Sequence, residues 1–371
     1  MQGNSIAGGK TPLRKYFDAN DVFRESHTGL LVIDAYDGHV VFDYQSHKHF
    51  TPASNTKLLT YYAATKMMGN TLPSLEYCVV DSSLYFTGTG DPTLLYHHFG
   101  YAPTLDFLRH SPFELNYVER PMEDQRLGPG WSWSDYAYYY SAEKSSFPLY
   151  GNVVQLRKAA SENKTTVVPK AFEIQLFTKL DTSATDYSVN RQEYENVFYL
   201  NLPGGDIEVD EDVPYVYSSE TFLSLLADTL HRPIILASRF PADCARQSFY
   251  AVPADSVSKY ILKDSDNFLA EQMLLNISSQ LGDTLSSDKT IDYMMKSHLS
   301  ELSAQLHWVD GSGLSRYNMV TPRAMVNVLN KLYLEVPREK LFAFLPESGV
   351  SGTLRRSFVS LSGNIHAKPD R

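Results

Sequence analysis

The sequence predicts a mixed α/β (α+β) protein in which a β-rich segment is inserted between two helix-rich segments. The chain has 371 residues, more than one ordinary hydrophobic core organises, so we expect at least two structural units. Apolar residues recur at helical spacing before residue 70 and again after residue 257. Between about residues 72 and 251, short strand-like runs alternate with Gly, Pro and Asp, which favour turns.

The first helix-rich segment should begin with a β-hairpin. Residues 30–34 and 40–44 are rich in β-branched and aromatic side chains, and the Asp-Gly pair at 37–38 is a strong hairpin-turn signal. Residues 51–54, Thr-Pro-Ala-Ser, have the pattern of a helix start. Apolar residues then recur at helical spacing up to Gly69, so we expect a helix there.

The inserted segment should be mostly β-structure with few helices. Residues 83–86 and 172–176 have the composition of strands, and the acidic stretch 204–212 is most simply a solvated turn and edge strand. Helical spacing returns after the insertion in residues 257–278, 290–302 and 321–334.

Composition excludes several classes of protein. The net charge of −10 argues against a nucleic-acid partner, because phosphate contacts need clustered Lys and Arg. We also expect no integral membrane segment, since no apolar run approaches the ~20 residues that a span needs. Residues 1–15 lack the apolar core of a signal peptide, which fits a processed mature protein and a cytosolic one equally well.

The sequence predicts neither a cofactor nor a metal site. His47 and His49, and the His97–His98 pair, have no third ligand spaced with them, so loop histidines are the simpler interpretation. The glycines near residue 88 lack the third glycine and the helix of a dinucleotide-binding motif. The only cysteines, Cys78 and Cys244, do not make a disulfide framework, and we expect two buried thiols.

A candidate nucleophile and base lie at the first helix start. Ser54 and Lys57 form a Ser-x-x-Lys motif, and the three-residue spacing puts both side chains on one helix face. A helix N-terminus offers unpaired backbone N–H groups and favours negative charge, which suits a serine nucleophile. The amine can act as a base only if burial or nearby cations help it to lose its proton. The alternative is a helix cap beside a surface lysine.

Two further motifs follow in the order known from penicillin-recognising enzymes. Ser265, Asp266 and Asn267 form the only Ser-Asp-Asn of the chain and precede an apolar helical run, although a second helix cap would also explain them. Lys368 occupies the position of the lysine in a Lys-Thr-Gly motif, but Pro369 follows it. Ser-x-x-Lys, Ser-Asp-Asn and Lys-Thr-Gly together mark penicillin-binding proteins and class A β-lactamases.

Blocks along nearly the whole chain resemble the D-alanyl-D-alanine carboxypeptidases of peptidase family S13, the class C low-molecular-mass penicillin-binding proteins. The blocks are residues 51–59, 88–94, 131–136, 265–271, 310–318, 351–354 and 366–368. The 211 residues from Ser54 to Ser265 fit a family that inserts extra domains between its first two motifs, whereas a simple class A β-lactamase has no room for such an insertion.

The resemblance implies a penicillin-binding-protein and β-lactamase-like transpeptidase fold. Residues 1–73 and 250–371 would form the transpeptidase-like domain, and residues 74–249 the inserted β-rich domains. Ser54 would attack the scissile carbonyl and Lys57 would accept its proton. Ser265 would protonate the leaving amine, Asn267 would hold the substrate amide and Lys57, and Lys368 would bind the substrate carboxylate.

The resemblance also implies a substrate and a compartment. Substrates would be peptidoglycan stem peptides that end in D-Ala-D-Ala, with possible endopeptidase action on cross-links. β-Lactam antibiotics would acylate the enzyme, and the protein would lie in the periplasm or cell envelope. In the family, Thr-Gly and further strands follow the lysine at the position of Lys368, so the alternative is an inactive truncated homologue that only binds peptidoglycan or a partner.

Overall fold

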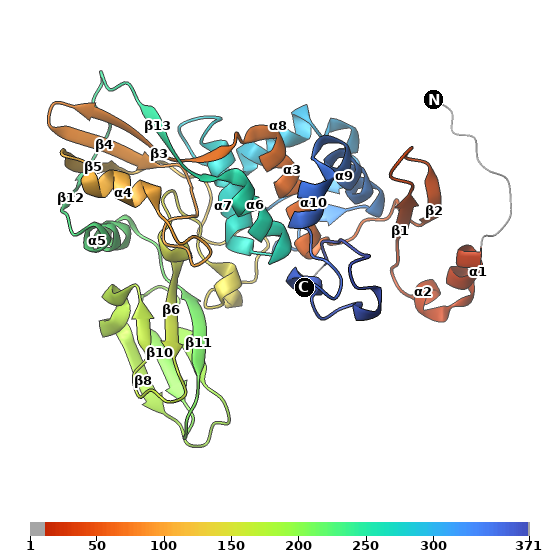
Figure 1. The fold of residues 1–371 in the computed structure, drawn as a ribbon, viewed down its shortest axis with the longest axis horizontal. Coiled ribbons are helices and arrows are strands. Elements are labelled where there is room, and N and C mark those ends of the chain that lie inside the picture. Colours follow the sequence, from red (N-terminus) through yellow and green to blue (C-terminus); the bar gives the residue numbers. More distant parts are fainter. Residues whose placement is uncertain (1–11, 370–371) are drawn as a thin grey trace.

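A computed structural model describes residues 12–369 (Figure 1). The helices are α1 (Pro12–Ala19), α2 (Asp21–Glu25), α3 (Lys57–Met67), α4 (Pro103–His110), α5 (Ser219–Leu230), α6 (Ala254–Lys263), α7 (Asn267–Ser278), α8 (Ser287–Ser297), α9 (Pro322–Glu335) and α10 (Arg338–Phe344). The strands are β1 (Leu30–Ile33), β2 (Val40–Tyr44), β3 (Thr71–Val80), β4 (Ser83–Gly88), β5 (Glu114–Val118), β6 (Val153–Lys158), β7 (Thr166–Val168), β8 (Leu176–Leu180), β9 (Ser188–Arg191), β10 (Phe198–Leu202), β11 (Val209–Pro214), β12 (Ile234–Ala237), β13 (Gln247–Pro253), β14 (Leu306–His307) and β15 (Met319–Val320).

A helical body forms one hydrophobic core around α7. All residues from 268 to 278 are buried, because α7 packs against α3, α6 and α8; its polar side chains, among them Glu271 and Asn276, are buried with hydrogen-bond partners. Asp266 starts this helix by accepting a hydrogen bond from the backbone N–H of Leu269. Helix α3 packs between α6, α7 and α9, so a segment before the insertion and three segments after it share this core (Figure 1).

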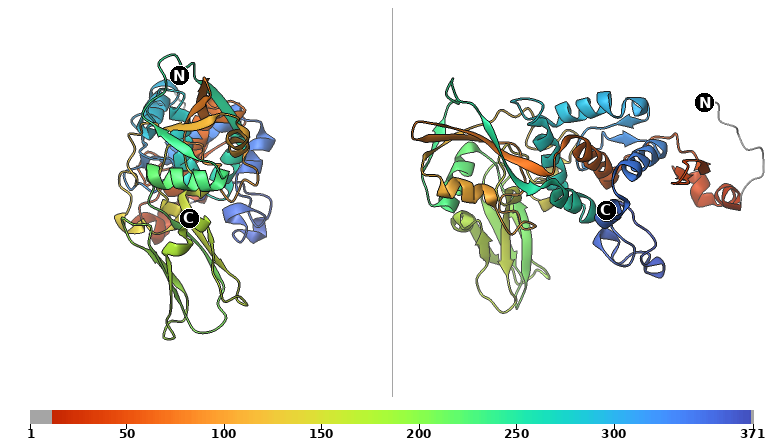
Figure 2. Two further views of the ribbon diagram at one scale, coloured as in Figure 1. Left: turned by 90° about the vertical axis from the view of Figure 1, so that its left-hand side faces the viewer. Right: turned by 45° about the horizontal axis from the view of Figure 1, so that its top comes forward.

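A second core lies in the β-rich part. The five-stranded sheet runs in the order β12-β5-β4-β3-β13, with α4 in contact with β13 and α5 in contact with β12. Two three-stranded sheets, β11-β6-β7 and β8-β10-β9, project away from the rest of the molecule (Figures 1 and 2). The division at residues 73 and 249 stays a prediction.

Several expected elements are present in the structure. Strands β1 and β2 form the expected antiparallel hairpin, and α3 follows the predicted helix start. The acidic stretch ends in β11, which is an edge strand of its sheet, as expected. The apolar segments after residue 257 contain α6, α7, α8 and α9.

Two local expectations were wrong, and a third segment divides where its motif indicates. Residues 170–175 form a 3-10 helix instead of a strand, because Phe172 turns inward against Phe198 and Tyr215; strand β8 begins only at Leu176. Helix α5 was not expected in the insertion, although Ser218 caps it and its apolar side is buried. The helical spacing over 257–278 belongs to two helices, α6 and α7, and α7 begins at the Ser265–Asn267 motif, where the sequence indicates a helix start.

The two cysteines are not free thiols. Cys78 on β3 and Cys244, shortly before β13, form a disulfide across two paired strands. Their separation of 166 residues hid this proximity, because only the pairing of β3 with β13 brings them together. The expectation of two buried thiols is therefore corrected.

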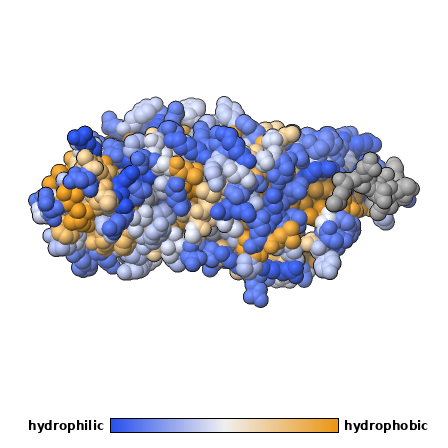
Figure 3. Space-filling view, turned by 90° about the horizontal axis from the view of Figure 1, so that it is seen from above, coloured by the Kyte–Doolittle hydropathy of each residue, from blue (hydrophilic) through white to orange (hydrophobic). Residues whose placement is uncertain are grey.

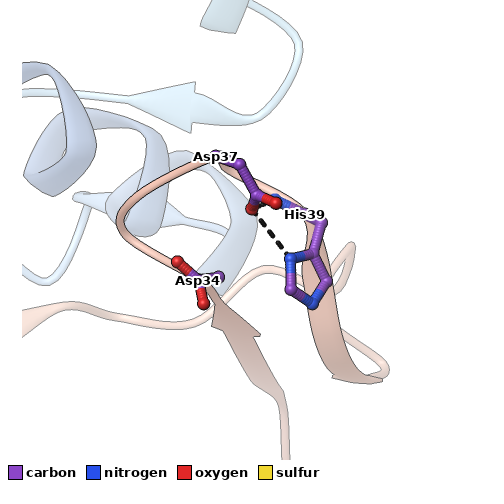
Figure 4. A group of neighbouring side chains, drawn as sticks. All are labelled: Asp34, Asp37 and His39. Atoms are coloured by element: carbon purple, nitrogen blue, oxygen red, sulfur yellow. Dashed lines mark hydrogen bonds and ion pairs between the residues drawn. The ribbon is translucent and has the colours of Figure 1, made fainter.

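Two surface features and the lengths of the helices complete the description. Hydrophobic surface gathers at the end of the molecule that holds the five-stranded sheet (Figure 3), where Ile235 and Leu236 of edge strand β12 are exposed. At the hairpin turn, exposed Asp34, Asp37 and His39 lie close together, and the His39 Nδ1–Asp37 Oδ1 distance is 2.8 Å (Figure 4). None of the helices in the described part of the chain combines the length and apolar character that a membrane span requires.

Candidate active site

The five predicted site residues come from separate parts of the chain and lie together. Ser54 lies in a 3-10 turn (Ala53–Thr56) that leads directly into α3, whose first residue is Lys57. Ser265 and Asn267 lie at the break between α6 and α7, and Lys368 follows a short bridge between residues 347 and 366. The structure thus brings all five side chains into one connected group.

Lys57 is the centre of this group and is completely buried. Its Nζ lies 2.6 Å from Oδ1 of Asn267 and 2.7 Å from the backbone oxygen of Ser312. The third contact is Ser54 Oγ, at 3.3 Å. Because two of these contacts are acceptors only, they can take two N–H groups of a neutral amine. The nitrogen lone pair is then left for the hydroxyl of Ser54.

A second chain of contacts runs from Ser54 to Lys368. The hydroxyl of Ser265 donates to Ser54 Oγ at 3.0 Å, and Lys368 Nζ donates to Ser265 Oγ at 2.9 Å. Lys368 is nearly buried, so its positive charge acts on this group with little screening by solvent. The serine hydroxyl of the first motif therefore lies between two lysines, one reached directly and one through Ser265.

The break between α6 and α7 is held by Asp266. Ser265 has a φ of +61°, a left-handed conformation that non-glycine residues rarely adopt. Asp266 Oδ1 caps α7, while Oδ2 accepts a hydrogen bond of 2.5 Å from Tyr96 and lies 3.5 Å from Nε2 of His98. Burial alone would raise the pKa of Asp266, but hydrogen bonds from His98, the Leu269 N–H and Tyr96 hold it below its usual value.

The loop at residues 310–318 contributes a backbone wall that the candidate residues did not include. A Cβ on Gly313, whose φ is +91°, would come within 1.8 Å of the backbone oxygen of Ala53, so this close approach requires glycine. Asp310 fixes the loop by accepting from the backbone N–H groups of Gly313 and Ser315. It also accepts from Trp131 Nε1 at 2.9 Å. The resemblance had marked these segments as blocks without giving them roles.

The group opens into a cleft of about 560 Å³. Ser54, Ser265, Asn267 and the 312–314 backbone line one part of it. The other walls come from residues of the inserted segment, namely Tyr96, His97, His98, Tyr139, Tyr140, Gly151, Val153 and Asp212. A cleft of this size accommodates a short peptide next to the two serine hydroxyls.

His97 and His98, interpreted from the sequence as loop histidines and not as metal ligands, line this cleft. His98 stacks on Tyr260, with ring centroids 4.0 Å apart, and burial lowers the pKa of His97. Among residues 12–369, the side chains grouped closely enough to hold a metal ion are the exposed Asp34, Asp37 and His39 at the hairpin turn. The cleft histidines are not part of such a group. The arrangement around Ser54 is thus one of hydroxyl, amine and amide groups.

Comparison with known proteins shows the family. The description "D-Ala-D-Ala carboxypeptidase 3 (S13) family" fits residues 13–202 and 250–369 of the chain. A penicillin-sensitive carboxypeptidase A of Dictyostelium discoideum is 33% identical over 117 residues, which are 29% of this chain and 22% of that protein. The D-alanyl-D-alanine carboxypeptidase of Actinomadura sp. strain R39 is 25% identical, over 96% of this chain and 76% of that protein.

Solved structures show the fold. Penicillin-binding protein 4 (DacB) of Haemophilus influenzae superposes with a TM-score of 0.72 at 20% identity, over 92% of this chain and 84% of that one. The same protein complexed with a β-lactam gives a TM-score of 0.65 at 18% identity, over 95% and 86% of the two chains. The chain therefore has the penicillin-binding-protein fold with additional domains, and it belongs to the D-Ala-D-Ala carboxypeptidase 3 (S13) family of serine peptidases.

Proposed function

We propose that this serine carboxypeptidase cleaves the terminal D-Ala-D-Ala bond of peptidoglycan stem peptides through an acyl-enzyme on Ser54. The observation that carries the proposal is the position of the Ser54 hydroxyl, 3.3 Å from Lys57 Nζ and 3.0 Å from Ser265 Oγ at the floor of the cleft. Nucleophile and base within hydrogen-bond reach, with the base oriented by a third group, is the arrangement expected for a covalent mechanism.

In the first step, Ser54 Oγ attacks the carbonyl carbon and its proton passes to Lys57. Asn267 and the Ser312 carbonyl orient the amine so that its lone pair faces the hydroxyl. The positive charge of Lys368, one hydroxyl away, favours the developing alkoxide and disfavours a second charge on Lys57. We assign the backbone N–H of Ser54 as one oxyanion donor; a donor of this kind contributes about 3–4 kcal/mol.

In the second step, the C–N bond breaks and the leaving D-alanine amine needs a proton. Ser265 can donate its own proton to that amine, and the Lys57 ammonium, which also lies next to Ser54 Oγ, then returns a proton to Ser265; Ser54 Oγ carries the acyl group at this stage and relays no proton. Water then attacks the acyl-enzyme, Lys57 accepts a proton from it, and Ser54 Oγ leaves with a proton. We propose that Lys368, whose Nζ also donates to the backbone oxygen of Pro369, attracts the terminal carboxylate of the peptide and so favours substrates with a free C-terminus.

We further propose that the protein works in the cell envelope, in the periplasm of its cell. The Cys78–Cys244 disulfide supports this, because disulfides persist in oxidising compartments and are rare in the cytosol. Endopeptidase action on cross-links would use the same acyl-enzyme. β-Lactams would acylate Ser54, since the related Haemophilus protein has been solved in complex with one.

Labelling with a fluorescent penicillin tests the proposal. The protein should form a stable covalent adduct that maps to Ser54 by peptide mass spectrometry. Ser54→Ala should abolish the adduct while the melting temperature is kept. Ser256→Ala is the matched control, because Ser256 begins another Ser-x-x-Lys sequence, on α6. Labelling of the Ser54→Ala variant at the unmodified rate would show that the nucleophile is another residue.

A further inference from the structure

Glu271 is a buried carboxylate behind the proposed base. It lies on α7, four residues after Asn267, so the two side chains share one helix face. Its exposed fraction is 1%, and Oε1 accepts a hydrogen bond of 2.8 Å from the backbone N–H of Ser312. The carbonyl of the same Ser312 holds Lys57 Nζ at 2.7 Å. Helix α7 therefore reaches Lys57 twice, directly through Asn267 and indirectly through Glu271 and Ser312.

The backbone between Glu271 and Lys57 has little freedom to move. A Cβ on Gly311 would lie 2.5 Å from the backbone oxygen of Ala270, and the Gly311 carbonyl accepts from Thr60 at 2.6 Å. On the other side of Ser312, Gly313 packs on the backbone of Ala53. The loop packs closely on both α3 and α7. The hydrogen bond from Ser312 to Glu271 therefore also fixes the position of the Ser312 carbonyl that contacts the amine of Lys57.

Two charged side chains from neighbouring segments face Glu271, namely Lys144 and Asp310, and Lys144 is itself paired with Asp124. Lys144 Nζ lies 3.9 Å from Glu271 Oε2 and 2.5 Å from Asp124, and Asp310 lies on the neighbouring loop. Among the described residues, Oε2 has no hydrogen-bond partner. Burial, together with the negative charge of Asp310, raises the pKa of Glu271 to about 7. A glutamine at position 271 would also offer an oxygen to the Ser312 N–H. The hydrogen bond alone therefore does not require the negative charge that a glutamate brings.

We propose that Glu271 is a positioning residue for acylation: it fixes the Ser312 backbone that holds the amine of Lys57, and its charge sets how tightly that amine keeps its proton. This inference rests on the proposed function of Ser54 and Lys57. Ionised Glu271 favours the charged form of Lys57. Protonated Glu271 carries no charge and no longer favours the charged form of Lys57. At a given pH, Lys57 is therefore more often neutral, and a better base, next to protonated Glu271 than next to ionised Glu271.

Three substitutions separate the two effects. Glu271→Gln keeps an acceptor for Ser312 and removes the charge, so the acid limb of the pH profile of penicillin acylation should move by about half a pH unit or more to lower pH. Glu271→Ala leaves the Ser312 N–H without that acceptor and should slow acylation at least about tenfold. Glu271→Asp keeps the charge but draws it back, and should slow acylation without moving the acid limb.

Asn276→Ala is the control for damage to α7. Asn276 is fully buried on the same helix and donates to the backbone oxygens of Pro73 and Thr89, away from Lys57. It should lower the melting temperature and leave the acid limb in place. A Glu271→Gln profile that coincides with that of the unmodified protein would overturn the proposal. So would an Asn276→Ala variant that shifts the limb equally.

A direct titration of Lys57 makes the test independent of activity. Protein labelled with ¹³C at the lysine side-chain carbons is followed by NMR against pH, and the Lys57 signal is assigned by its loss in Lys57→Arg. In Glu271→Gln, Lys57 should lose its proton at lower pH than in the unmodified protein. An unchanged midpoint would refute the inference. If the unmodified protein forms no penicillin adduct, the proposed function fails and the role in acylation fails with it, whereas a changed Lys57 midpoint in Glu271→Gln would still show that Glu271 controls the protonation of Lys57.

Discussion

Replacing Lys57 by arginine keeps a positive charge in the site but removes a group that can lose its proton. Guanidinium stays charged in proteins, so under the proposed mechanism the variant lacks the base that would accept the proton of Ser54. The geometry adds a second penalty, because Lys57 is completely buried and touches three groups within 3.3 Å. A larger side chain there forces neighbouring groups to move, which destabilises a core by about 1–3 kcal/mol.

The expected loss follows from the role of a general base. Such a group contributes about 10²–10⁴ in rate, so Lys57→Arg should acylate with penicillin slower by roughly that factor. Lys57→Ala should be about as slow, even though it removes the charge as well as the base. Arginine is therefore no conservative replacement here, although charge is retained.

The assay is the second-order rate of fluorescent penicillin acylation, measured with the melting temperature of each variant. Lys66→Arg is the matched control, since Lys66 lies on the same helix and pairs with Glu335 near the surface. A Lys57→Arg variant that keeps more than about a tenth of the rate would refute the role of Lys57 as base. Adding Ser265→Ala to Lys57→Ala should slow acylation little further, because groups that act as a unit are not additive.

Three other predictions follow from the same geometry. Lys368→Met should slow acylation by penicillins, which carry a carboxylate, by about 10–100-fold, the usual effect of losing a charge-assisted hydrogen bond; the rate constant shows it. Replacing Cys78 and Cys244 by alanine should lower the free energy of unfolding by about 2–5 kcal/mol in urea, with little change in the acylation rate. The raised pKa of Glu271, about 7, means that the folded protein binds more protons than the unfolded chain between roughly pH 4.5 and 7. Its contribution to stability is therefore lost as pH rises through that window, and Glu271→Gln should flatten the fall of melting temperature with pH.

The side chains that the structure brings together around Ser54 could be named from the sequence because local motifs carry them; their roles stay predictions. Ser54 and Lys57 share one turn, and a helix start followed by apolar spacing placed them at the N-terminus of α3. Ser265 and Asn267 flank a residue that caps α7, which is also a local signal. The family resemblance, and not any of these patterns, joined the motifs into one site.

The missed features are those that depend on distant contacts. The oxygens of Ser312 and Tyr140 hold Lys57 and Asn267, but they are backbone oxygens, which every residue type carries. The disulfide depends on strand pairing across 166 residues. The helix start at α7 was expected from the motif, but the backbone that separates it from α6 was not: Ser265 is left-handed and Asp266 is extended.

In the proposed mechanism, residues 131–140 of the expected insertion support the groups that orient Lys57. Asn267 Nδ2 donates to the backbone oxygen of Tyr140 at 3.1 Å, while its Oδ1 holds Lys57. Trp131, from the same segment, holds Asp310 and with it the loop that carries Ser312. Asn267 and the loop of Ser312, which both contact the amine of Lys57, are thus held by hydrogen bonds with Tyr140 and Trp131. Changes in the 131–140 stretch should therefore alter the acylation rate as well as substrate binding, because they reach the base through two short hydrogen-bonded paths.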